Sequence, residues 1–476
     1  MGKLSEDDEH KLVEKSQVAP NNPKTTSFPL TFLDISLAGP IYGRRQFFYN
    51  FPYSTHHFLQ TTFPTLKRSL SLTLQRFFPL AGSLLCPPPP HPPFVRCTEE
   101  DFVTFMVFES SSDFNHLSGN NPRILKKLDQ LVPKLTCKII HHHHDTLIFP
   151  NLALQATIFP NRGVCIAITY NHVIDGTCCA QFMNFWSSLC ARGIDSSVFE
   201  KLTPPCFDRE VLKDPKELGA IFLKDYFQDR ENWKNKLIDH SRPFDSTVFM
   251  EEDHVRVTIV FDKHDIERMQ TFSLNQLKKK YGLKSPQYVS KFVVACGFAW
   301  SSLVKARAIE RDSEDGDDNE EEEYFCFAAD CRGRLEYPVP ENYFGNCITQ
   351  CNVTLRGSEV NGEGGFVNAV KAIDRAINDM KKEPFGGMEN WKESLKKMFG
   401  SGRVLVVGGS PKFKVYENDF GFGRPCKVEM VQSLKGLSIA ETPNNQGGFE
   451  LGVVLKNISQ SKTFLSVVKQ GLKALK

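Results

Sequence analysis

Apolar residues recur along the chain with two different periods. In residues 62–78 they follow a helical spacing, and Pro79 with the turn after it ends this predicted helix. Residues 152–159 and 164–170 alternate or run apolar, and the sequence Pro-Asn-Arg-Gly joins them, which predicts two strands connected by a turn. Helical spacing returns in residues 180–189. The first part of the chain therefore mixes helices and strands.

The rest of the chain shows the same mixture. Strands are predicted at 255–261, 324–329, 403–407, 426–432 and 449–455, and helices from 263, at 289–305 and at 462–472. Residues 192–253 are poor in regular pattern and are interrupted by prolines, which favours a linker. Ten acidic residues in 310–323 predict a disordered loop. We therefore expect an α/β protein with domains at 1–200 and 251–476 and a crossover linker at 201–250.

Composition excludes several classes of protein. The 476 residues carry a formal net charge of +2, so the chain has no overall field to hold nucleic acid. The longest apolar run, residues 292–300, is half of what a membrane span needs. The acidic N-terminus lacks the features of a signal peptide, and the fourteen cysteines include no C-x-x-C pair. We expect a cytoplasmic protein with reduced thiols, no metal site and no membrane partner.

Three groups of histidines compete as candidate chemistry. His141 to His144 precede Asp145, but four consecutive side chains cannot all face one ion, which favours a polar loop. His172 follows a strand and precedes an Asp-Gly turn, a place where a general base would be held rigidly; a structural role is the alternative. His254 and His264 flank a strand and suggest surface positions. A nucleophile elbow, a Walker A loop and the H-E-x-x-H motif are absent from the sequence.

Seven short motifs in a fixed order narrow these alternatives. They are FPLTFLD at 28–34, FPLAG at 78–82, FPNRG at 159–163, HVIDG at 172–176, DCRGRL at 330–335, YFGNC at 343–347 and DFGFG at 419–423. With these motifs the chain resembles, nearly end to end, the plant BAHD acyl-CoA-dependent acyltransferases. The YFGNC string places the resemblance in the branch that acylates anthocyanins and other flavonoid glycosides.

The resemblance implies a fold, a reaction and a set of site residues. The expected fold has two domains, like chloramphenicol acetyltransferase, with a solvent channel between them. His172 would act as the general base that deprotonates the acceptor hydroxyl, which then attacks the thioester directly. Acyl-CoA is a co-substrate, and no cofactor is expected. The resemblance implies support for the site from Asp175 paired with Arg332 and from the loop residues Asp419, Gly421 and Gly423, and substrate binding by Tyr343 and Asn346.

Two departures from the family pattern bear on activity. The family motif has three residues between its His and Asp, whereas only Val173 and Ile174 separate them here, and such a shortened turn could misplace the imidazole. Phe422 stands where the family usually has Trp, which keeps the aromatic packing and loses an N–H group. We expect a mild effect from the second change.

The acyl donor is less determined by the sequence. Malonyl-CoA users in this branch often carry an Arg four residues after the motif Asp, and that position here is Cys179. Arg424 is the candidate to hold a donor carboxylate instead, since an Arg can bind a carboxylate with two hydrogen bonds. We expect malonyl-CoA by a small margin. Cys179 is expected to take part in substrate binding, and it fits the alternative donors, hydroxycinnamoyl-CoA or acetyl-CoA, better.

We interpret the chain as a monomeric acyltransferase of plant specialised metabolism. Its partners would be an acyl-CoA donor and a small-molecule acceptor, expected to be a sugar hydroxyl of a flavonoid-type glycoside. An alkaloid alcohol or amine is an alternative acceptor. A catalytically impaired relative that only binds CoA or a metabolite is the alternative from another class.

Overall fold

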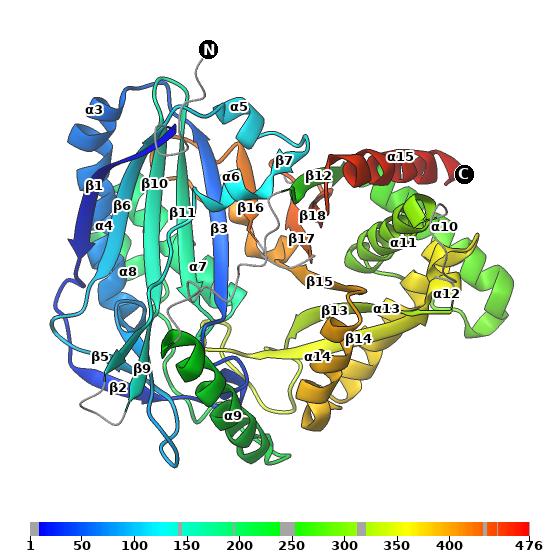
Figure 1. The fold of residues 1–476 in the computed structure, drawn as a ribbon, viewed down its shortest axis with the longest axis horizontal. Helices are drawn as coiled ribbons and strands as arrows, with labels where there is room; N and C mark the ends of the chain where they lie inside the picture. Colours follow the sequence, from blue (N-terminus) through cyan, green and yellow to red (C-terminus); the bar gives the residue numbers. More distant parts are fainter. Residues whose placement is uncertain are drawn as a thin grey trace.

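The computed structural model describes residues 9–140, 145–193, 196–238, 253–311, 320–431, 436–444 and 446–475. It contains three β-sheets, and the two larger ones form the centres of two halves placed side by side (Figure 1). The predicted α/β architecture is confirmed. His141 to His144 and residues 312–319 of the acidic segment lie outside the described residues.

The N-terminal half is built on a six-stranded sheet. Its strand order is β1 (His10–Val18), β6 (Val103–Ser110), β10 (Leu152–Phe159), β11 (Gly163–Asn171), β3 (Tyr42–Asn50) and β16 (Lys427–Met430). Every residue of β10 and β11 is buried, because both faces of these central strands are covered. One face packs on helices α4 (Phe63–Arg76) and α7 (Gly176–Arg192). The two strands and two helices predicted here are confirmed.

The C-terminal half is built on a seven-stranded sheet. Its order is β14 (Ile348–Arg356), β13 (Glu322–Asp330), β15 (Val404–Gly408), β17 (Gly436–Glu441), β18 (Phe449–Leu455), β12 (Val255–Phe261) and β7 (Arg123–Ile124). The apolar residues of this half form one buried core, in which the helices take part: α10 (Lys263–Tyr281), α11 (Lys291–Arg311), α13 (Gly365–Lys382) and α15 (Ile458–Ala474). By length and composition α11 could cross a membrane, but two thirds of its apolar window, 67%, is buried in this core.

The two halves exchange one strand each. Strand β16 comes from the C-terminal part of the chain but pairs antiparallel with β3 of the first sheet. Strand β7 comes from the N-terminal part but pairs antiparallel with β12 of the second sheet. Each sheet therefore ends in a strand supplied by the other half, and the halves are interlocked by backbone hydrogen bonds.

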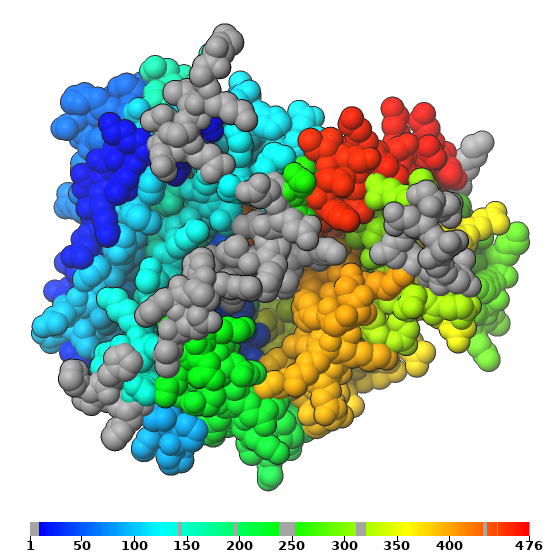
Figure 2. Space-filling model, in the orientation of Figure 1, coloured from blue at the N-terminus to red at the C-terminus, as the bar shows by residue number. Residues whose placement is uncertain are grey.

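The segment predicted as a linker contains a long helix. Helix α9 (Leu218–Ile238) occupies much of residues 201–250. It packs on α2 (Phe32–Ile35), and Leu218 and Phe222 join a small buried core with residues of both halves. Figure 2 shows α9 in green against the N-terminal half and beside the orange atoms of α14 (Trp391–Gly400). The sequence did not predict this helix, which is held by tertiary contacts; the role of residues 201–250 as a linker between domains stays a prediction.

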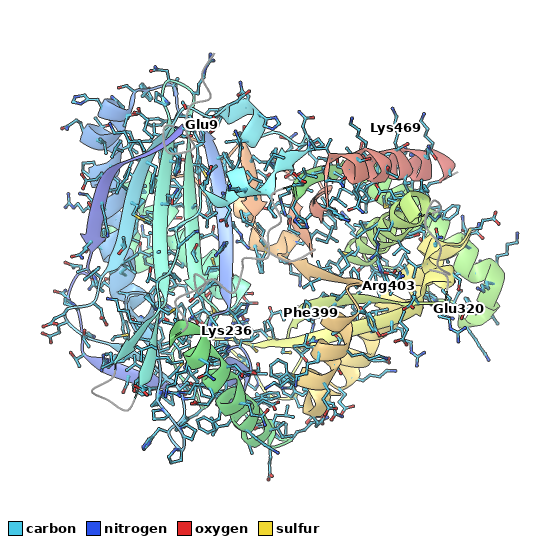
Figure 3. The ribbon with its side chains drawn as sticks, in the orientation of Figure 1. Glu9, Lys236, Glu320, Phe399, Arg403 and Lys469 are labelled. Atoms are coloured by element: carbon cyan, nitrogen blue, oxygen red, sulfur yellow. The ribbon has the colours of Figure 1, made fainter. Side chains whose placement is uncertain are left out.

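A third, smaller sheet and several short helices complete the fold. The sheet has the order β2 (Thr26–Pro29), β5 (Phe94–Cys97), β4 (Ser83–Cys86), β9 (Thr146–Pro150) and β8 (Lys138–Ile140). The short helices are α3 (Thr55–His57), α5 (Phe114–Leu117), α6 (Leu125–Asp129), α8 (Ser196–Lys201) and α12 (Gly357–Asn361). Side chains fill the space around these elements, as Figure 3 shows, with Lys236 near the end of α9 and Arg403 just before β15.

Candidate active site

His172 lies in the turn between β11 and α7. Its backbone N–H donates to the carbonyl oxygen of Ile41 over 2.8 Å. The preceding residue, Asn171, is fully buried and donates from its side chain to the carbonyl oxygen of Gly39 over 2.9 Å. These bonds fix the end of the strand to the neighbouring chain segment. The turn therefore holds the partly exposed imidazole in place although it is one residue shorter than the family pattern.

Asp175 closes the same turn and has two structural partners. One carboxylate oxygen accepts from the backbone N–H of Cys178 over 3.0 Å, which caps the N-terminus of α7. The other accepts from Nη1 of Arg332 over 2.7 Å. The Asp175 and Arg332 side chains are 1% and 4% exposed, so this ion pair is shielded from water. The pairing expected from the resemblance is present.

Asn346 connects the C-terminal half to the imidazole. Its Nδ2 donates to Asp34 Oδ1 over 3.0 Å and to the carbonyl oxygen of His172 over 2.8 Å. Both partners can only accept, so these contacts assign the orientation of the amide. Oδ1 of Asn346 then faces Nδ1 of His172 at 3.0 Å. Because Oδ1 can only accept, Nδ1 carries the proton and Nε2 keeps a free lone pair.

Asp34 stands behind Asn346 and was not singled out from the sequence. Its fully buried carboxylate accepts from the backbone N–H of Asn346 over 2.8 Å and from the Thr31 hydroxyl over 2.9 Å. Arg209 Nη1 lies 3.5 Å from the same carboxylate. Asp34 and Asn346 are 312 positions apart in the sequence, so no local pattern could have joined them. The 28–34 motif was the only signal that pointed at Asp34.

The surroundings of His172 favour the neutral imidazole. Burial lowers its pKa below the ordinary value of 6.5, and the charge of Asp175 and the hydrogen bond to Asn346 oppose this only in part. At neutral pH the ring is therefore unprotonated at Nε2, as a general base must be.

Tyr343 and Cys179 are both fully buried. The Tyr343 hydroxyl accepts from Arg209 over 2.9 Å, and the guanidinium groups of Arg209 and Arg332 lie 5.6 and 5.7 Å from the centre of its ring. Cys179 is fully buried in α7, and burial raises the pKa of its thiol to about 11. The substrate-binding roles expected for Tyr343, Cys179 and Asn346 remain predictions.

The Asp-Phe-Gly-Phe-Gly loop forms a tight turn. One Asp419 oxygen accepts from the backbone N–H groups of Gly421 over 2.7 Å and Gly423 over 3.0 Å. These glycines have φ values of +96° and +102°, which other residues rarely adopt. The Phe422 ring packs edge-on against Tyr49. Arg424, next in the chain, is exposed, and its expected role as a carboxylate clamp stays a prediction.

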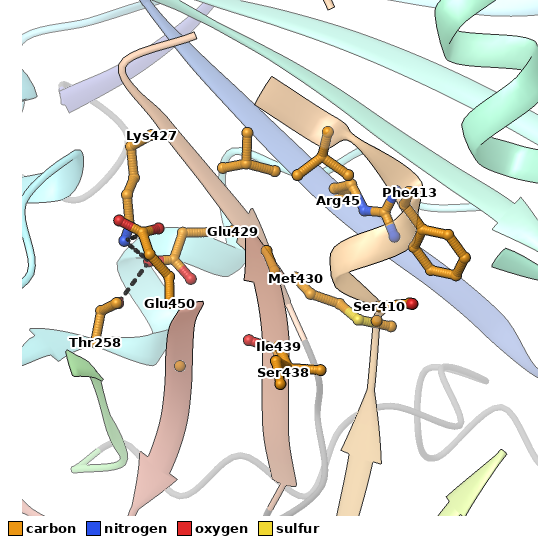
Figure 4. A pocket seen from close by; sticks show the side chains of 15 residues that line it. Arg45, Thr258, Ser410, Phe413, Lys427, Glu429, Met430, Ser438, Ile439 and Glu450 are labelled. Carbon is orange, nitrogen blue, oxygen red and sulfur yellow. Dashed lines mark hydrogen bonds and ion pairs between the residues drawn. The ribbon is translucent and has the colours of Figure 1, made fainter. Parts of the chain in front are cut away.

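His254 does not lie where the sequence predicted. His254 is 7% exposed, so its predicted surface position was wrong: it directly precedes the buried strand β12 and accepts from the backbone of Leu125. Within the described part of the chain, His, Cys, Asp and Glu residues form no group that could hold a metal ion. One cavity between the halves is lined by Arg45 and Phe413, and the Phe413 ring lies against Gly176, which follows the His172 turn (Figure 4).

Comparisons with known proteins identify similar sequences and a similar fold. A family model described as the Transferase family matches residues 11–464. A malonyl-coenzyme A:anthocyanin 3-O-glucoside-6''-O-malonyltransferase from Dahlia pinnata is 34% identical over 479 residues, covering 97% of each chain. An agmatine coumaroyltransferase from Arabidopsis thaliana is 30% identical and covers 96% of this chain and 98% of its own. The crystal structure of vinorine synthase matches the fold with a TM-score of 0.65 at 19% identity, covering 96% of this chain and 98% of its own.

Proposed function

Because the chain belongs to the Transferase family, the BAHD acyl-CoA-dependent acyltransferases, we propose that it acylates a sugar hydroxyl of a flavonoid-type glycoside. The relatives that support this acceptor include the Dahlia malonyltransferase and a coumaroyl-CoA:anthocyanidin 3-O-glucoside-6''-O-coumaroyltransferase from Arabidopsis thaliana, 33% identical over 97% of each chain. The donor is an acyl-CoA, with malonyl-CoA the first choice.

In the proposed reaction His172 is the general base. Its Nε2 takes the proton of the acceptor hydroxyl while the hydroxyl oxygen attacks the thioester carbonyl. A carbon–oxygen bond forms, the carbon–sulfur bond breaks, and the proton passes from the imidazole to the departing CoA thiolate. The products are an ester and free CoA, so no covalent enzyme intermediate is needed.

The observation that carries this proposal is the contact between His172 Nδ1 and Asn346 Oδ1, at 3.0 Å. It selects the tautomer with a free Nε2 lone pair, and Asp34 behind Asn346 holds the amide in that orientation. A histidine with only a structural role would need no such choice of tautomer. The shortened motif keeps both this contact and the Asp175–Arg332 ion pair.

The test is a turnover assay with the purified full-length protein. Malonyl-CoA, coumaroyl-CoA and acetyl-CoA are each offered with an anthocyanidin 3-O-glucoside, and the release of free thiol and the product mass are measured. We expect a product one acyl group heavier and an equal amount of thiol. If no donor is consumed with any acceptor, the catalytic proposal fails. The alternative, that the protein only binds CoA or a metabolite, is then favoured.

An amine acceptor is the second candidate. The similarity to the Arabidopsis agmatine coumaroyltransferase favours including it, and a base at His172 Nε2 can also deprotonate an attacking nitrogen. Agmatine belongs in the same assay as a parallel acceptor. If the amide forms faster than the ester, the acceptor is an amine and not a glycoside.

We also propose that the enzyme works as a cytosolic monomer with no resident cofactor. Support comes from composition: the net charge is +2, and all fourteen cysteines are free thiols, as in proteins of reducing compartments. The mass from light scattering would test the monomer, and the cell fraction that contains the activity would test the compartment. Turnover by protein dialysed against a chelator would test the absence of a cofactor.

A further inference from the structure

The cavity between the halves is lined by both sheets. It is partly open to solvent, and its walls come from β3 and β16 of the first sheet and from β12, β17, β18 and the residues after β15 of the second. Figure 4 shows Arg45 and Phe413 on one side and Lys427, Glu429 and Glu450 on the other. The cavity therefore has two cations in its walls, Arg45 and Lys427.

Only one of these cations has protein partners. Lys427 Nζ lies 2.9 Å from the carboxylate of Glu450 and 2.8 Å from the side-chain oxygen of Asn120. Arg45 is 4% exposed, yet its side chain makes no ion pair or hydrogen bond with the residues that the structure describes, and its Nη1 is a buried donor without an acceptor. Its guanidinium lies over the ring of Phe413, 5.3 Å from the ring centre.

The neighbouring arginines show how unusual this is. Arg44, on the opposite face of β3, lies 2.8 Å from the carboxylate of Asp129. Arg123 and Arg256 are fully buried, and both pair with Glu429, at 2.7 and 2.5 Å. A buried cation without a partner is costly, because its hydration is lost and nothing replaces it. Arg45 differs from these three arginines because no carboxylate among the described residues pairs with it.

A second carboxylate could compete for Arg45. Positive charge on Arg45 helps to lower the pKa of Glu441, although burial is the largest influence and the net pKa is raised. Glu441 is engaged elsewhere, since one of its oxygens accepts from the backbone N–H of Tyr416 over 3.0 Å. No ion pair joins Glu441 to Arg45 in the described coordinates, so the guanidinium remains available to a ligand.

Two contacts connect Arg45 to the candidate base. Arg45 and Gly43 lie on one face of β3, and the ring of Tyr170 rests on Gly43, where an added Cβ would lie 2.1 Å from the ring. That ring is 6.4 Å from the imidazole of His172. On the other side, Phe413 touches Gly176, the first residue of α7, where an added Cβ would lie 2.7 Å from its ring. Arg45 therefore belongs to the wall that continues from the His172 turn.

We propose that Arg45 binds the free carboxylate of a dicarboxylic acyl group, so that the donor is malonyl-CoA or a close analogue. This inference rests on the proposed function and names its donor class. The planar guanidinium can hold a carboxylate with two parallel hydrogen bonds, and the face of Phe413 keeps it flat. In this proposal Arg45 of β3 supplies the positive charge for the donor carboxylate, which Cys179 in α7 cannot provide.

The test separates the acyl carboxylate from the rest of the donor. Malonyl-CoA and acetyl-CoA carry the same phosphates and differ by one carboxylate. The ratio of kcat/KM for the two donors therefore reports the contribution of that carboxylate. Dissociation constants from calorimetry and kcat/KM values are measured for both donors with the wild type and with Arg45→Met. We expect Arg45→Met to lower kcat/KM for malonyl-CoA by about thirtyfold or more and to change that for acetyl-CoA by less than about threefold.

Three more variants make the result specific. Arg45→Lys keeps the charge and the fold but loses the paired hydrogen bonds, so its loss with malonyl-CoA should be intermediate. Arg375→Met removes an exposed arginine of α13, 81% exposed at its side chain, and should change neither donor. Arg424→Met tests the rival clamp. If Arg424→Met, and not Arg45→Met, selectively impairs malonyl-CoA, the proposal is overturned.

The remaining outcomes also decide. An equal loss for both donors in Arg45→Met means that the guanidinium meets a CoA phosphate, which overturns the proposal, as does no loss for either. If Arg45→Met does not fold, the wild-type affinities decide, because a protein that binds acetyl-CoA as tightly as malonyl-CoA has no carboxylate site. If no donor is turned over at all, the proposed function fails, while the difference in affinity still tests Arg45.

Discussion

At the scale of single residues, His172 has the partners that a general base needs. Replacing it with Ala should lower kcat by about a hundredfold or more, the ordinary contribution of a positioned base. The melting temperature should stay close to that of the wild type, since the side chain is partly exposed and makes one side-chain hydrogen bond. Steady-state kinetics and a thermal melt measure the two quantities.

A control replaces His141 to His144 together with Ala. The sequence places this run in a polar loop, so turnover should stay near the wild-type value. Loss of turnover in this variant, with an active His172→Ala enzyme, would show that the base had been assigned to the wrong histidine.

The pH dependence tests the role of Asn346. Burial lowers the pKa of His172, so the acidic limb of kcat/KM should lie below pH 6.5. The bond from Asn346 raises that pKa, because it stabilises the protonated ring; Asn346→Ala should therefore move the limb further down and also lower kcat. A merely structural Asn346 would reduce activity without moving the limb.

The same shift has a consequence for stability. His172 has a pKa near 6.5 in the unfolded chain and a lower pKa in the folded chain. Between the two pKa values the unfolded state therefore binds more protons than the folded state. The free energy of unfolding should fall as the pH drops below 6.5. His172→Ala should remove this part of the pH dependence, which denaturant titrations at several pH values would show.

The ion pair of Asp175 and Arg332 makes a sharper stability prediction. Asp175→Ala leaves a buried guanidinium without its carboxylate and should lower the free energy of unfolding by about 3–5 kcal/mol. Asp330 lies 3.2 Å from the same guanidinium but is 45% exposed, so Asp330→Ala should cost less than about 1 kcal/mol. Equal losses in urea denaturation would mean that the burial of Asp175 adds nothing.

Residue-scale prediction from sequence succeeded where a motif carried the information. His172, Asp175 and Arg332 were named because each belongs to a short string. Arg209 and Arg45 were not, since their environment is made by residues from distant segments. The sequence does not show whether a charged residue in an apolar strand has a partner. Arg44 has one, whereas the side chain of Arg45 has none among the described residues.

At the scale of elements, the Asp419 turn depends on the backbone of its glycines. Gly423 has open space around it but a φ of +102°, so Gly423→Ala should cost about 1–3 kcal/mol through backbone strain alone. Gly400, at the end of α14, has the same open space and no such φ. Gly400→Ala should be neutral or stabilising by up to about 1 kcal/mol. The difference between the melting temperatures of the two variants measures the cost of the backbone strain at Gly423.

If both glycine variants melt at the wild-type temperature, the turn tolerates a side chain and its positive φ carries no structural information. Activity should follow stability in Gly423→Ala, since the loop packs against β3 through Phe422 and Tyr49 rather than against the described cavity.

Element prediction worked best where one period continued over many residues. Strands β12 and β18 match their predicted bounds, and α4 agrees within two residues, because their apolar pattern is regular and their ends carry turn residues. Helix α9 was missed because its apolar face is weakly patterned and depends on contacts with α2 and the small core. The sequence also contained no sign that β16 would leave its own half and join β3.

At the scale of the whole molecule, a cluster of charges sits where the exchanged strands meet. Glu429 on β16 is paired with Arg123 of β7, at 2.7 Å, and with Arg256 of β12, at 2.5 Å. Lys427 lies 3.8 Å from it. One carboxylate thus joins both exchanged strands to the second sheet. The side chains of this cluster are at most 3% exposed, so water screens them little.

Glu429→Gln should therefore destabilise the whole molecule. It leaves three buried cations around a neutral group and should lower the free energy of unfolding by about 3–5 kcal/mol at pH 7. Glu323→Gln is the matched control inside one half, since Glu323 pairs with Arg307 and Arg403 beside β13. The control should also destabilise, but it should leave the contact between the halves intact; limited proteolysis between them would rise in Glu429→Gln only.

The pH dependence distinguishes charge from shape in this cluster. Burial would raise the pKa of Glu429, but Arg123, Arg256 and Lys427 outweigh it and hold the pKa well below the ordinary 4.5. The carboxylate therefore contributes its full stability above pH 4.5 and loses it as the pH falls through the lower, folded-state pKa. The difference in free energy of unfolding between wild type and Glu429→Gln should be largest at neutral pH and shrink below pH 4.5. A difference that stays constant from pH 7 to pH 3 would mean that the halves are joined by packing and backbone pairing, and that the charge of Glu429 adds nothing to them.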